Sequence, residues 1–400
     1  MTAVCAEGSR TNDPSSWPFV RRMNRRVLPL VMGLLLLPLG CGDDPVGPFD
    51  TLAVATTSLP NAGRTLAYSA TLVATGGDDD HTWSVADGSL PTDLSLAVTG
   101  EISGTPTVAG TSDFTVEVAS GDGQTFEQML SITVSGLFLD SDFAVQIESD
   151  VVYATGAVRS PTVGEIDLLL DVYRSAGANL PALRPGFILI HGGGFTGGTK
   201  SNATMVAFGN AYAQRGYVAV SIEYRLVGDD PPTEALAQDA GDPVSVAAVA
   251  ARVDAVKAVE WMRANAATLG IDPDRIAVGG YSAGAITALG LAYRDPGVDG
   301  ADVQVVLSLS GGLYGLESLI DADEAPLIMI HGTADPTVPF SLAEAIEDRA
   351  LSVGLTHEFY PLEGVGHGTP SVLVGTVVDG ITLADRIRNF FYVHLDLGSL

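Results

Sequence analysis

From about residue 140 to residue 400, continuous apolar runs alternate with longer stretches whose apolar residues recur at helical spacing. Uninterrupted apolar runs are typical of strands buried on both faces, so this alternation predicts a mostly parallel sheet with helices on both faces. The eight predicted strands are 145–153, 166–173, 187–190, 217–222, 276–279, 303–309, 327–330 and 357–360. The predicted helices are 204–215, 246–269, 283–293, 342–352 and 381–395. Ligands of such sheets bind at the carboxyl ends of the strands.

Residues 51–136 have a different pattern. Short runs of alternating apolar and polar residues, at 65–73, 81–85, 114–118 and 129–134, are separated by turn-forming residues. Strands at such spacing predict a small all-β sandwich. The chain therefore divides into this β domain and an α/β domain at 140–400.

The β domain contains Gly-Ser-Leu-Pro at 88–91 and Ile-Ser-Gly-Thr-Pro at 102–106, after Trp83. Over about its whole length it resembles a bacterial family of Ig-like domains. The resemblance implies an extracellular, cadherin-like spacer or a binding module, for which contact with a polysaccharide stays open. The acidic run at 78–80 could indicate calcium, but no ligand spacing accompanies it. A solvated loop is therefore the preferred interpretation, and no metal is expected.

The first 40 residues carry the features of an export signal. The apolar run at 27–39 is too short to span a bilayer as a helix, which needs about 20 residues, and it follows four arginines at 21–26. It leads into Leu39-Gly40-Cys41, which resembles the bacterial lipoprotein box, although Pro38 stands where leucine is usual. The resemblance implies a lipidated Cys41; ordinary signal cleavage is the alternative. Met23 is a candidate start, which would leave residues 1–22 untranslated, and residues 41–50 are predicted to be a flexible tether.

The chain is strongly acidic, with 20 Lys and Arg against 48 Asp and Glu. Such a surface repels nucleic acid and anionic membranes, so membrane contact is expected only through the N-terminal lipid anchor. Cys5 and Cys41 both precede the predicted domains, so no disulfide framework is expected. The protein is expected to be exported and held at the bacterial cell envelope, at the outer membrane, or else secreted.

Gly280-Tyr281-Ser282-Ala283-Gly284 reads Gly-x-Ser-x-Gly between an apolar strand and an Ala-rich helix. In that context the motif forms a nucleophile elbow, in which the serine takes strained backbone angles and exposes its hydroxyl at the end of the sheet. The flanking glycines leave room for the strand and the helix to pass closely. Taken alone, the motif could also be an ordinary glycine-rich turn.

A nucleophilic serine needs a base, and the base needs an acid that fixes its tautomer. Among the six histidines, His367 is the best candidate because it lies between glycines in a loop after the last predicted strand. The other five are excluded by their positions. His81 lies in the β domain and His394 in the last helix, while His357 begins a strand. His191 precedes a glycine-rich loop, and His331 lies only four residues before the best acid.

The best acid is Asp335, which follows the predicted strand 327–330. The chain order Ser282, Asp335, His367 is that of α/β-hydrolases. The rivals, which precede the strand and should lie at its opposite end, are Asp321, Asp323 and Glu324.

A tetrahedral intermediate carries an oxyanion, which fixed N–H groups must face. The sequence His191-Gly192-Gly193-Gly194-Phe195 follows a predicted strand, and its glycines allow close approach of the backbone. Gly193 and Gly194 are the expected donors, together with the amide of Ala283, while His191 is expected to orient the loop. No Gly-Lys-Ser/Thr or dinucleotide fingerprint is present in the sequence, so a phosphate cradle is not favoured.

Four motifs follow one another along the chain: His-Gly-Gly-Gly-Phe at 191–195, Gly-Tyr-Ser-Ala-Gly at 280–284, Gly-Thr-Ala-Asp-Pro-Thr-Val-Pro at 332–339 and Gly-His-Gly at 366–368. In this order they resemble the carboxylesterase branch of α/β-hydrolases over roughly residues 145–395. That branch includes hormone-sensitive-lipase-like esterases and bacterial feruloyl or acetyl-xylan esterase-like proteins. The resemblance implies a serine carboxylesterase with a Ser282–His367–Asp335 triad and no cofactor, acting on short-acyl or polysaccharide-linked acetyl or feruloyl esters. The short polar segment 228–242 implies a small lid and an open site. Two alternatives stay open: a serine peptidase of the same fold, and an adhesive or carbohydrate-binding surface protein.

Overall fold

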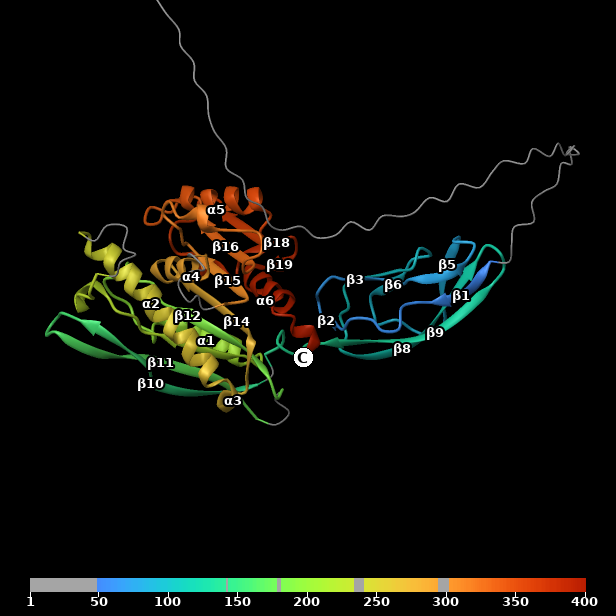
Figure 1. Ribbon diagram of the computed structural model, residues 1–400, viewed down its shortest axis with the longest axis horizontal. Coiled ribbons are helices and arrows are strands. Elements are labelled where there is room, and N and C mark those ends of the chain that lie inside the picture. Colours follow the sequence, from blue (N-terminus) through green and yellow to red (C-terminus); the bar gives the residue numbers. More distant parts are fainter. Residues whose placement is uncertain (1–48, 142, 178–180, 234–240, 294–301) are drawn as a thin grey trace, which may run out of the picture. The chain divides into compact units, whose positions relative to one another are not determined.

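The computed structural model describes residues 49–400 except 142, 178–180, 234–240 and 294–301 (Figure 1). The predicted export signal, Cys41 and almost all of the predicted tether lie outside the described residues. Within the described part of the chain, no helix is long and apolar enough to cross a membrane.

Strands are the regular secondary structure of the N-terminal domain, residues 50–135. Two sheets, in the orders β2-β9-β8-β5 and β3-β7-β6, and a β1-β4 pair surround a core that includes Trp83, Ile102 and Phe114. The strands are β1 (Asp50–Val54), β2 (Ala62–Gly63), β3 (Tyr68–Thr71), β4 (Ala74–Gly77), β5 (His81–Gly88), β6 (Leu94–Leu96), β7 (Glu101–Gly104), β8 (Gly110–Ser120) and β9 (Thr125–Ser135).

The acidic run of this domain forms part of a turn. Asp78 Oδ1 accepts hydrogen bonds from Ser120 Oγ at 2.6 Å and from the Gly121 amide at 2.9 Å, which ties the turn before β5 to the end of β8. Among the described residues, no group of three or more His, Cys, Asp and Glu side chains could hold a metal ion.

The rest of the chain is built on an eight-stranded sheet in the order β10-β11-β13-β12-β14-β15-β16-β17. Its strands are β10 (Ala144–Val158), β11 (Gly164–Ala176), β12 (Arg184–Ile190), β13 (Val218–Ile222), β14 (Ile271–Tyr281), β15 (Val305–Leu309), β16 (Leu327–Gly332) and β17 (His357–Leu362). β11 pairs antiparallel with β10 and with β13, and all later pairings are parallel. The sheet is therefore mostly parallel, as the pattern of apolar runs predicted.

Helices cover both faces of this sheet (Figure 1). Alternate residues of β12 explain why: Ile188 and Ile190 pack into one core cluster, while Phe187 and Leu189 pack into another. The first cluster includes residues of α2 (Pro243–Ala264), α3 (Ala266–Leu269), α4 (Ala283–Tyr293) and α5 (Phe340–Val353). The second includes residues of α1 (Ala203–Ala213) and α6 (Leu383–His394).

The single helix predicted over 246–269 is wrong in one detail, because α2 ends at Ala264 and α3 begins at Ala266. Asn265 interrupts the helix: its ψ is 7°, and its side-chain amide donates a 2.8 Å hydrogen bond to the Trp261 carbonyl. Asparagine side chains compete in this way for backbone groups, which an apolar repeat does not reveal.

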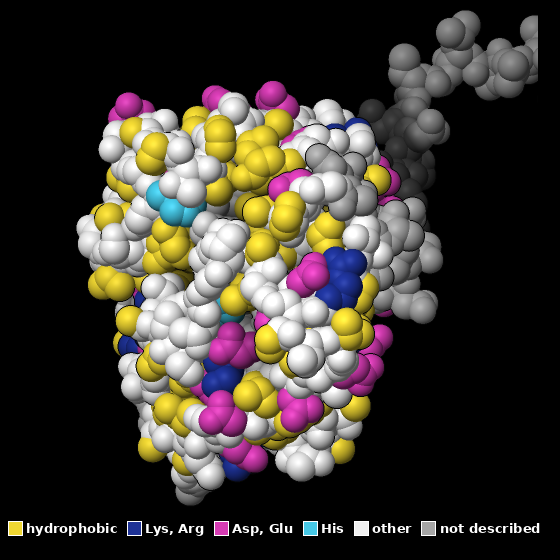
Figure 2. Space-filling view, turned by 90° about the vertical axis from the view of Figure 1, so that its left-hand side faces the viewer, with side chains coloured by type: hydrophobic (Ala, Val, Ile, Leu, Met, Phe, Trp, Pro, Cys, Tyr) yellow, Lys and Arg dark blue, Asp and Glu magenta, His cyan; other side chains and the backbone are white. Residues whose placement is uncertain are grey.

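Figure 2 shows one face of the molecule, on which Lys and Arg side chains gather in small groups beside acidic ones. The described ion pairs include Arg159 Nη2 to Asp230 Oδ1 at 2.7 Å. No broad basic surface, of the kind that binds phosphate backbones, is seen on the described part of that face.

Candidate active site

Ser282 lies between β14 and α4, at the carboxyl end of the sheet. Its φ is +56°, the left-handed region that side chains other than glycine rarely adopt, and its amide donates a 2.9 Å hydrogen bond to the Leu309 carbonyl. The flanking glycines make this turn possible. A Cβ on Gly280 would lie 2.4 Å from the Gly284 backbone, and one on Gly284 would lie 2.0 Å from the Ile190 oxygen.

Three residues that are far apart in the sequence form one hydrogen-bonded chain. His367 Nε2 lies 2.8 Å from Ser282 Oγ, and His367 Nδ1 lies 2.7 Å from Asp335 Oδ2. The carboxylate can only accept, so Nδ1 carries the proton and Nε2 is the acceptor for the serine hydroxyl. Asp335 follows β16 and His367 follows β17, so all three residues lie past the carboxyl ends of strands.

The Asp335 carboxylate is held on both oxygens. Oδ1 accepts from the amides of Thr337 at 2.8 Å and Val338 at 3.0 Å, while Oδ2 faces His367. Burial by itself raises the pKa of this carboxyl, but the hydrogen bonds from His367 and from the two amides outweigh it and leave the pKa below its usual value. Asp335 is therefore ionised at neutral pH.

His331 also touches the acid. Its Nε2 donates a 2.9 Å hydrogen bond to the Val338 carbonyl and lies 3.4 Å from Asp335 Oδ2. Burial lowers the pKa of His331, so the imidazole is neutral at neutral pH. His331 is the second-to-last residue of β16 and precedes the acid by four positions in the chain.

The remaining candidates from the sequence lie away from this chain of hydrogen bonds. Asp321 is exposed and pairs with Arg349 at 3.2 Å. Asp323 and Glu324 precede β16, so they lie at the end of this strand opposite to Asp335. His81 contacts the Gly76 carbonyl in the β domain, and His357 pairs with Glu347 at 2.8 Å. His394 packs its ring 4.2 Å from that of Phe390 in α6.

The glycine-rich loop after β12 runs beside Ser282. Gly194, with φ of +60°, and Ala283, the first residue of α4, line the same pocket as Ser282. The first amides of a helix have no partner within the helix, which leaves the Ala283 amide available for a ligand. Gly193 is not among the described lining residues; its carbonyl accepts from the amides of Thr196 and Gly197, and a Cβ there would lie 2.0 Å from the Gly197 oxygen.

Glu223, a residue that sequence reasoning missed, anchors this loop at both ends. Its Oε1 accepts from Thr199 Oγ1 at 2.8 Å and from the Lys200 amide at 3.1 Å, and its Oε2 lies 3.3 Å from His191 Nε2. Tyr224 stacks on the His191 ring and donates a 2.8 Å hydrogen bond to the His191 carbonyl. His191 thus lies at the base of the loop.

Tyr281 is a second residue that the sequence did not single out. It precedes the nucleophile, and its hydroxyl donates a 2.8 Å hydrogen bond to the His367 carbonyl, with the two rings 5.1 Å apart. Tyr281 is the first variable residue of the Gly-x-Ser-x-Gly motif, and this position next to the nucleophile could have drawn attention to it. The motif does not, however, indicate what the residue contacts.

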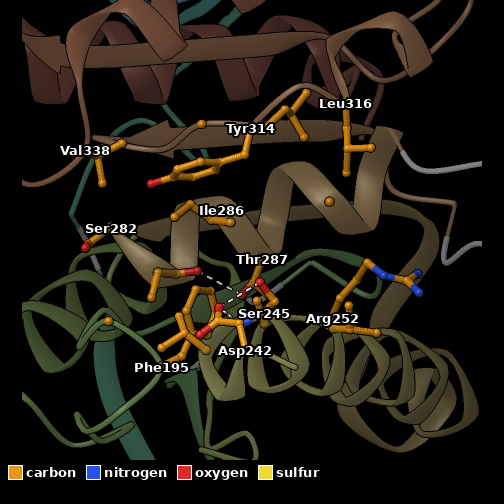
Figure 3. Close-up of a pocket in the computed structure, with 18 of the residues that line it drawn as sticks. Phe195, Asp242, Ser245, Arg252, Ser282, Ile286, Thr287, Tyr314, Leu316 and Val338 are labelled. Carbon is orange, nitrogen blue, oxygen red and sulfur yellow. Dashed lines mark hydrogen bonds between the residues drawn. The ribbon is translucent and has the colours of Figure 1, made fainter. Parts of the chain in front are cut away.

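A pocket of about 450 Å³ opens beside Ser282 (Figure 3). Its walls come from α2, from α4, and from the segments that follow β15 and β16. In Figure 3, Ser282 and Val338 lie at one end and Leu316 lies at the other, with Ile286 between them and the Tyr314 ring above Ile286. Most of the lining side chains are apolar.

The fold and the site define an α/β-hydrolase whose strand ends bring together a serine, a histidine and an aspartate. Family models agree with this architecture: BD-FAE matches residues 170–304, Phospholipase/Carboxylesterase matches residues 249–383, and an Ig-like domain family, He_PIG, matches residues 50–135.

An uncharacterized protein of Mycobacterium tuberculosis, Rv2307c, is 31% identical over 232 residues, which cover 51% of this chain and 74% of that protein. The chain belongs to the same family as this protein, within the α/β-hydrolases.

Relatives with a named activity are esterases and lipases. Fumonisin B1 esterase of Sphingopyxis macrogoltabida is 34% identical over 35% of this chain and 25% of the relative. Chlorogenic acid esterase of Aspergillus niger is 31% identical over 36% of this chain and 27% of the relative. The chain thus spans about a quarter of the length of these relatives.

Among solved structures, an esterase of Thermogutta terrifontis, Est2, matches with a TM-score of 0.48 at 22% identity, over 63% of this chain and 93% of that chain.

Proposed function

We propose that this protein is a serine carboxylesterase that cleaves carboxylic esters through an acyl-enzyme on Ser282. The observation that carries the proposal is the continuous chain of hydrogen bonds from Ser282 Oγ through His367 to Asp335, at 2.8 and 2.7 Å. These distances are within reach for proton transfer in the ground state.

In the first half of the reaction, Ser282 Oγ attacks the ester carbonyl carbon and His367 Nε2 takes the hydroxyl proton. The ionised Asp335 stabilises the imidazolium that forms. His367 then gives the proton to the leaving alcohol oxygen, the carbon–oxygen bond of the ester breaks, and the acyl-enzyme remains.

In the second half, a water molecule takes the place of the alcohol. His367 removes its proton as it attacks the acyl carbon, and the same proton then returns to Ser282 Oγ as the acid leaves. The negative charge of each tetrahedral intermediate is assigned to the amides of Ala283 and Gly194, with Gly193 as the other donor proposed from the sequence. Preorganised donors of this kind typically contribute a factor of about 100 to 1000 each in rate.

Fluorophosphonate labelling and p-nitrophenyl acetate hydrolysis test this proposal. The wild type is expected to react at Ser282 and to hydrolyse the ester, and Ser282→Ala is expected to lose both. His367→Ala and Asp335→Asn should each lower kcat by about 1000-fold or more, and the double variant should lose little further, because triad members act as a unit. Activity of Ser282→Ala within tenfold of the wild type would refute the assignment.

Asp335→Asn is informative because asparagine can keep the hydrogen bonds from Thr337 and Val338 through its carbonyl oxygen. Its amide group, however, donates toward His367 Nδ1 and favours the tautomer in which Nε2 carries the proton. That tautomer cannot act as the base. Unchanged unfolding behaviour together with lost activity would separate this effect from misfolding.

For the substrate, the proposal covers short-acyl esters and polysaccharide-linked acetyl or feruloyl esters. The match of the BD-FAE family model to residues 170–304 and the similarity to a chlorogenic acid esterase support it. A panel from acetyl to decanoyl esters, with methyl ferulate and acetylated xylan, tests it. An equivalent panel of anilides would identify a serine peptidase, if amides were cleaved faster than the matching esters.

We further propose that the protein is exported and anchored through a lipidated Cys41, with the Ig-like domain as a spacer or polysaccharide contact. The support is the arginine cluster, the apolar run and the Leu39-Gly40-Cys41 sequence. Palmitate labelling of the full chain in a bacterial host should be lost in Cys41→Ser. A Cys41→Ser chain that stays with the membrane would contradict the anchor.

A further inference from the structure

The pocket beside Ser282 runs along one face of α4. Its lining residues on that helix are spaced three or four apart, which places them in a row on the same face: Ala283, Ile286, Thr287 and Gly290. At 1.5 Å per residue, the row extends about 10 Å from the nucleophile to Gly290. Residues of α2 at the same spacing, Ser245, Ala248 and Arg252, form the facing wall.

The position of the histidine shows which part of an ester this pocket can hold. The leaving alcohol must lie next to His367 Nε2, because that atom gives it a proton. The described lining of the pocket contains Gly194 and Ala283, the proposed oxyanion donors, but neither His367 nor Asp335. The pocket thus extends from the side of Ser282 that is away from the leaving group, where the acyl group lies.

The far end of the row is closed by the approach of α2 to α4. A Cβ on Gly290 would lie 3.5 Å from Arg252 Cδ, which is ordinary van der Waals contact. Packing therefore does not require glycine here, in contrast to Gly284, where a Cβ would lie 2.0 Å from a carbonyl oxygen. Glycine inside a helix is destabilising. What its missing side chain provides at position 290 is space at the end of the pocket.

We propose, on the basis of the esterase function above, that this pocket binds the acyl group and that Gly290 and Ala248 limit its length. A chain of single bonds advances about 1.2 Å per bond, as in an extended backbone, so a depth of about 10 Å accepts an acyl chain of about eight carbons. A volume of about 450 Å³ also accommodates an aromatic acyl group. Among the ester substrates proposed above, those with larger apolar acyl groups, up to about eight carbons, are therefore expected to be preferred over acetates.

The apolar lining of the pocket determines how much each added acyl carbon strengthens binding. Ile286, Leu313 and Leu316 contribute aliphatic surface to the pocket, and each methylene buried against such surface strengthens binding by roughly fourfold. The wild type is therefore expected to increase in kcat/KM from acetyl to about octanoyl p-nitrophenyl esters, and to decrease beyond the length at which the pocket is full.

The test uses three variants of the full chain. Gly290→Leu places an isobutyl group at the end of the pocket. Ala248→Leu places the same group about one helical turn nearer to the nucleophile. Ala264→Leu is the matched control, because Ala264 lies on the same helix as Ala248 but is exposed at its last position. The ratio of kcat/KM for octanoate to that for acetate is measured in each.

Gly290→Leu is expected to lower this ratio at least tenfold, and Ala248→Leu to lower it and to move the maximum to a shorter chain. Ala264→Leu should keep the wild-type ratio. A parallel series with one acyl group and alcohols of increasing size should keep its wild-type profile in all variants. An unchanged acyl profile in both pocket variants, or a change in the alcohol series instead, would overturn the proposal.

A binding measurement separates failure of this inference from failure of the esterase function. Calorimetric titration of Ser282→Ala with sodium octanoate and sodium acetate needs no turnover. Octanoate is expected to bind at least tenfold more tightly than acetate, and Gly290→Leu in the same background should abolish the difference. Equal affinities would refute the acyl pocket, even if the wild type proves to be an active esterase.

Discussion

The Tyr281 hydroxyl donates a 2.8 Å hydrogen bond to the backbone carbonyl of His367. The residue that precedes the nucleophile thereby fixes the loop that carries the base, across 86 positions of sequence. The rigid end of β14 and the glycine-flanked loop after β17 are joined at the point where Ser282 and His367 must meet.

Tyr281→Phe is expected to lower kcat about fivefold with little change in KM. The variant loses one partly buried hydrogen bond, worth about 1 kcal/mol, but keeps the ring against His367. Tyr281 does not line the described pocket, so substrate binding should be unaffected. Steady-state kinetics on p-nitrophenyl acetate provides both constants. A change confined to KM would argue against a role in positioning the base.

Glu223→Ala is expected to lower kcat about 100-fold, because the loop that carries the proposed oxyanion donors loses its anchors at Thr199, at Lys200 and near His191. Glu223→Gln keeps an acceptor for Thr199 and Lys200 and should recover most of the activity. The fluorophosphonate reaction rate follows the same site without turnover. Equal activities of the two variants would show that the loop does not depend on these contacts.

Gly284→Ala and Gly290→Ala are the same substitution on one helix, with opposite expected effects on stability. At position 284 the Cβ would lie 2.0 Å from the Ile190 oxygen, so the variant should lose more than 3 kcal/mol or fail to fold. At position 290 the contact is ordinary, and the higher helix propensity of alanine should add up to about 1 kcal/mol. Urea unfolding followed by the helical circular dichroism signal measures both.

The acid side of the stability profile should depend on His331. Burial lowers the pKa of this histidine in the folded protein, so below the ordinary value of about 6.5 the unfolded chain binds a proton that the folded chain does not. The contribution of His331 to the free energy of unfolding is fully present above a pH of about 6.5. It decreases as the pH falls from there toward the pKa of His331 in the folded protein. Asp335, His367 and the Val338 carbonyl surround it.

His331→Gln removes this proton uptake and should flatten the decrease in the free energy of unfolding between pH of about 6.5 and 5. The side chain can still donate to Val338, so the fold should be kept. His394, whose pKa is also lowered by burial, contributes a slope of the same sign in both proteins. A wild-type slope that survives in His331→Gln would assign the effect to other groups.

Much of the framework was predictable from the sequence, because it depends on local patterns. All eight strands of the large sheet were predicted, and continuous apolar runs marked the inner strands such as β12, β13, β15 and β16, since strands buried on both faces need apolar residues on both sides. The shortest strands of the β domain, such as β2 with two residues and β6 with three, fell outside the predicted runs. Two or three residues are too few to show an alternation.

Ser282 was selected from the Gly-x-Ser-x-Gly motif, and Asp335 and His367 were selected because each follows a predicted strand and therefore lies at the same edge of the sheet. Only the tertiary structure decided that they touch, that Gly194 and not Gly193 lines the pocket, and that Tyr281, Glu223 and His331 lie around them. The reason is physical: periodicity records which residues are buried, whereas contacts between loops depend on how several strands and helices pack together. The row from Ala283 to Gly290 was visible as a helix in the sequence, but it became the wall of a pocket only where α2 packs against it.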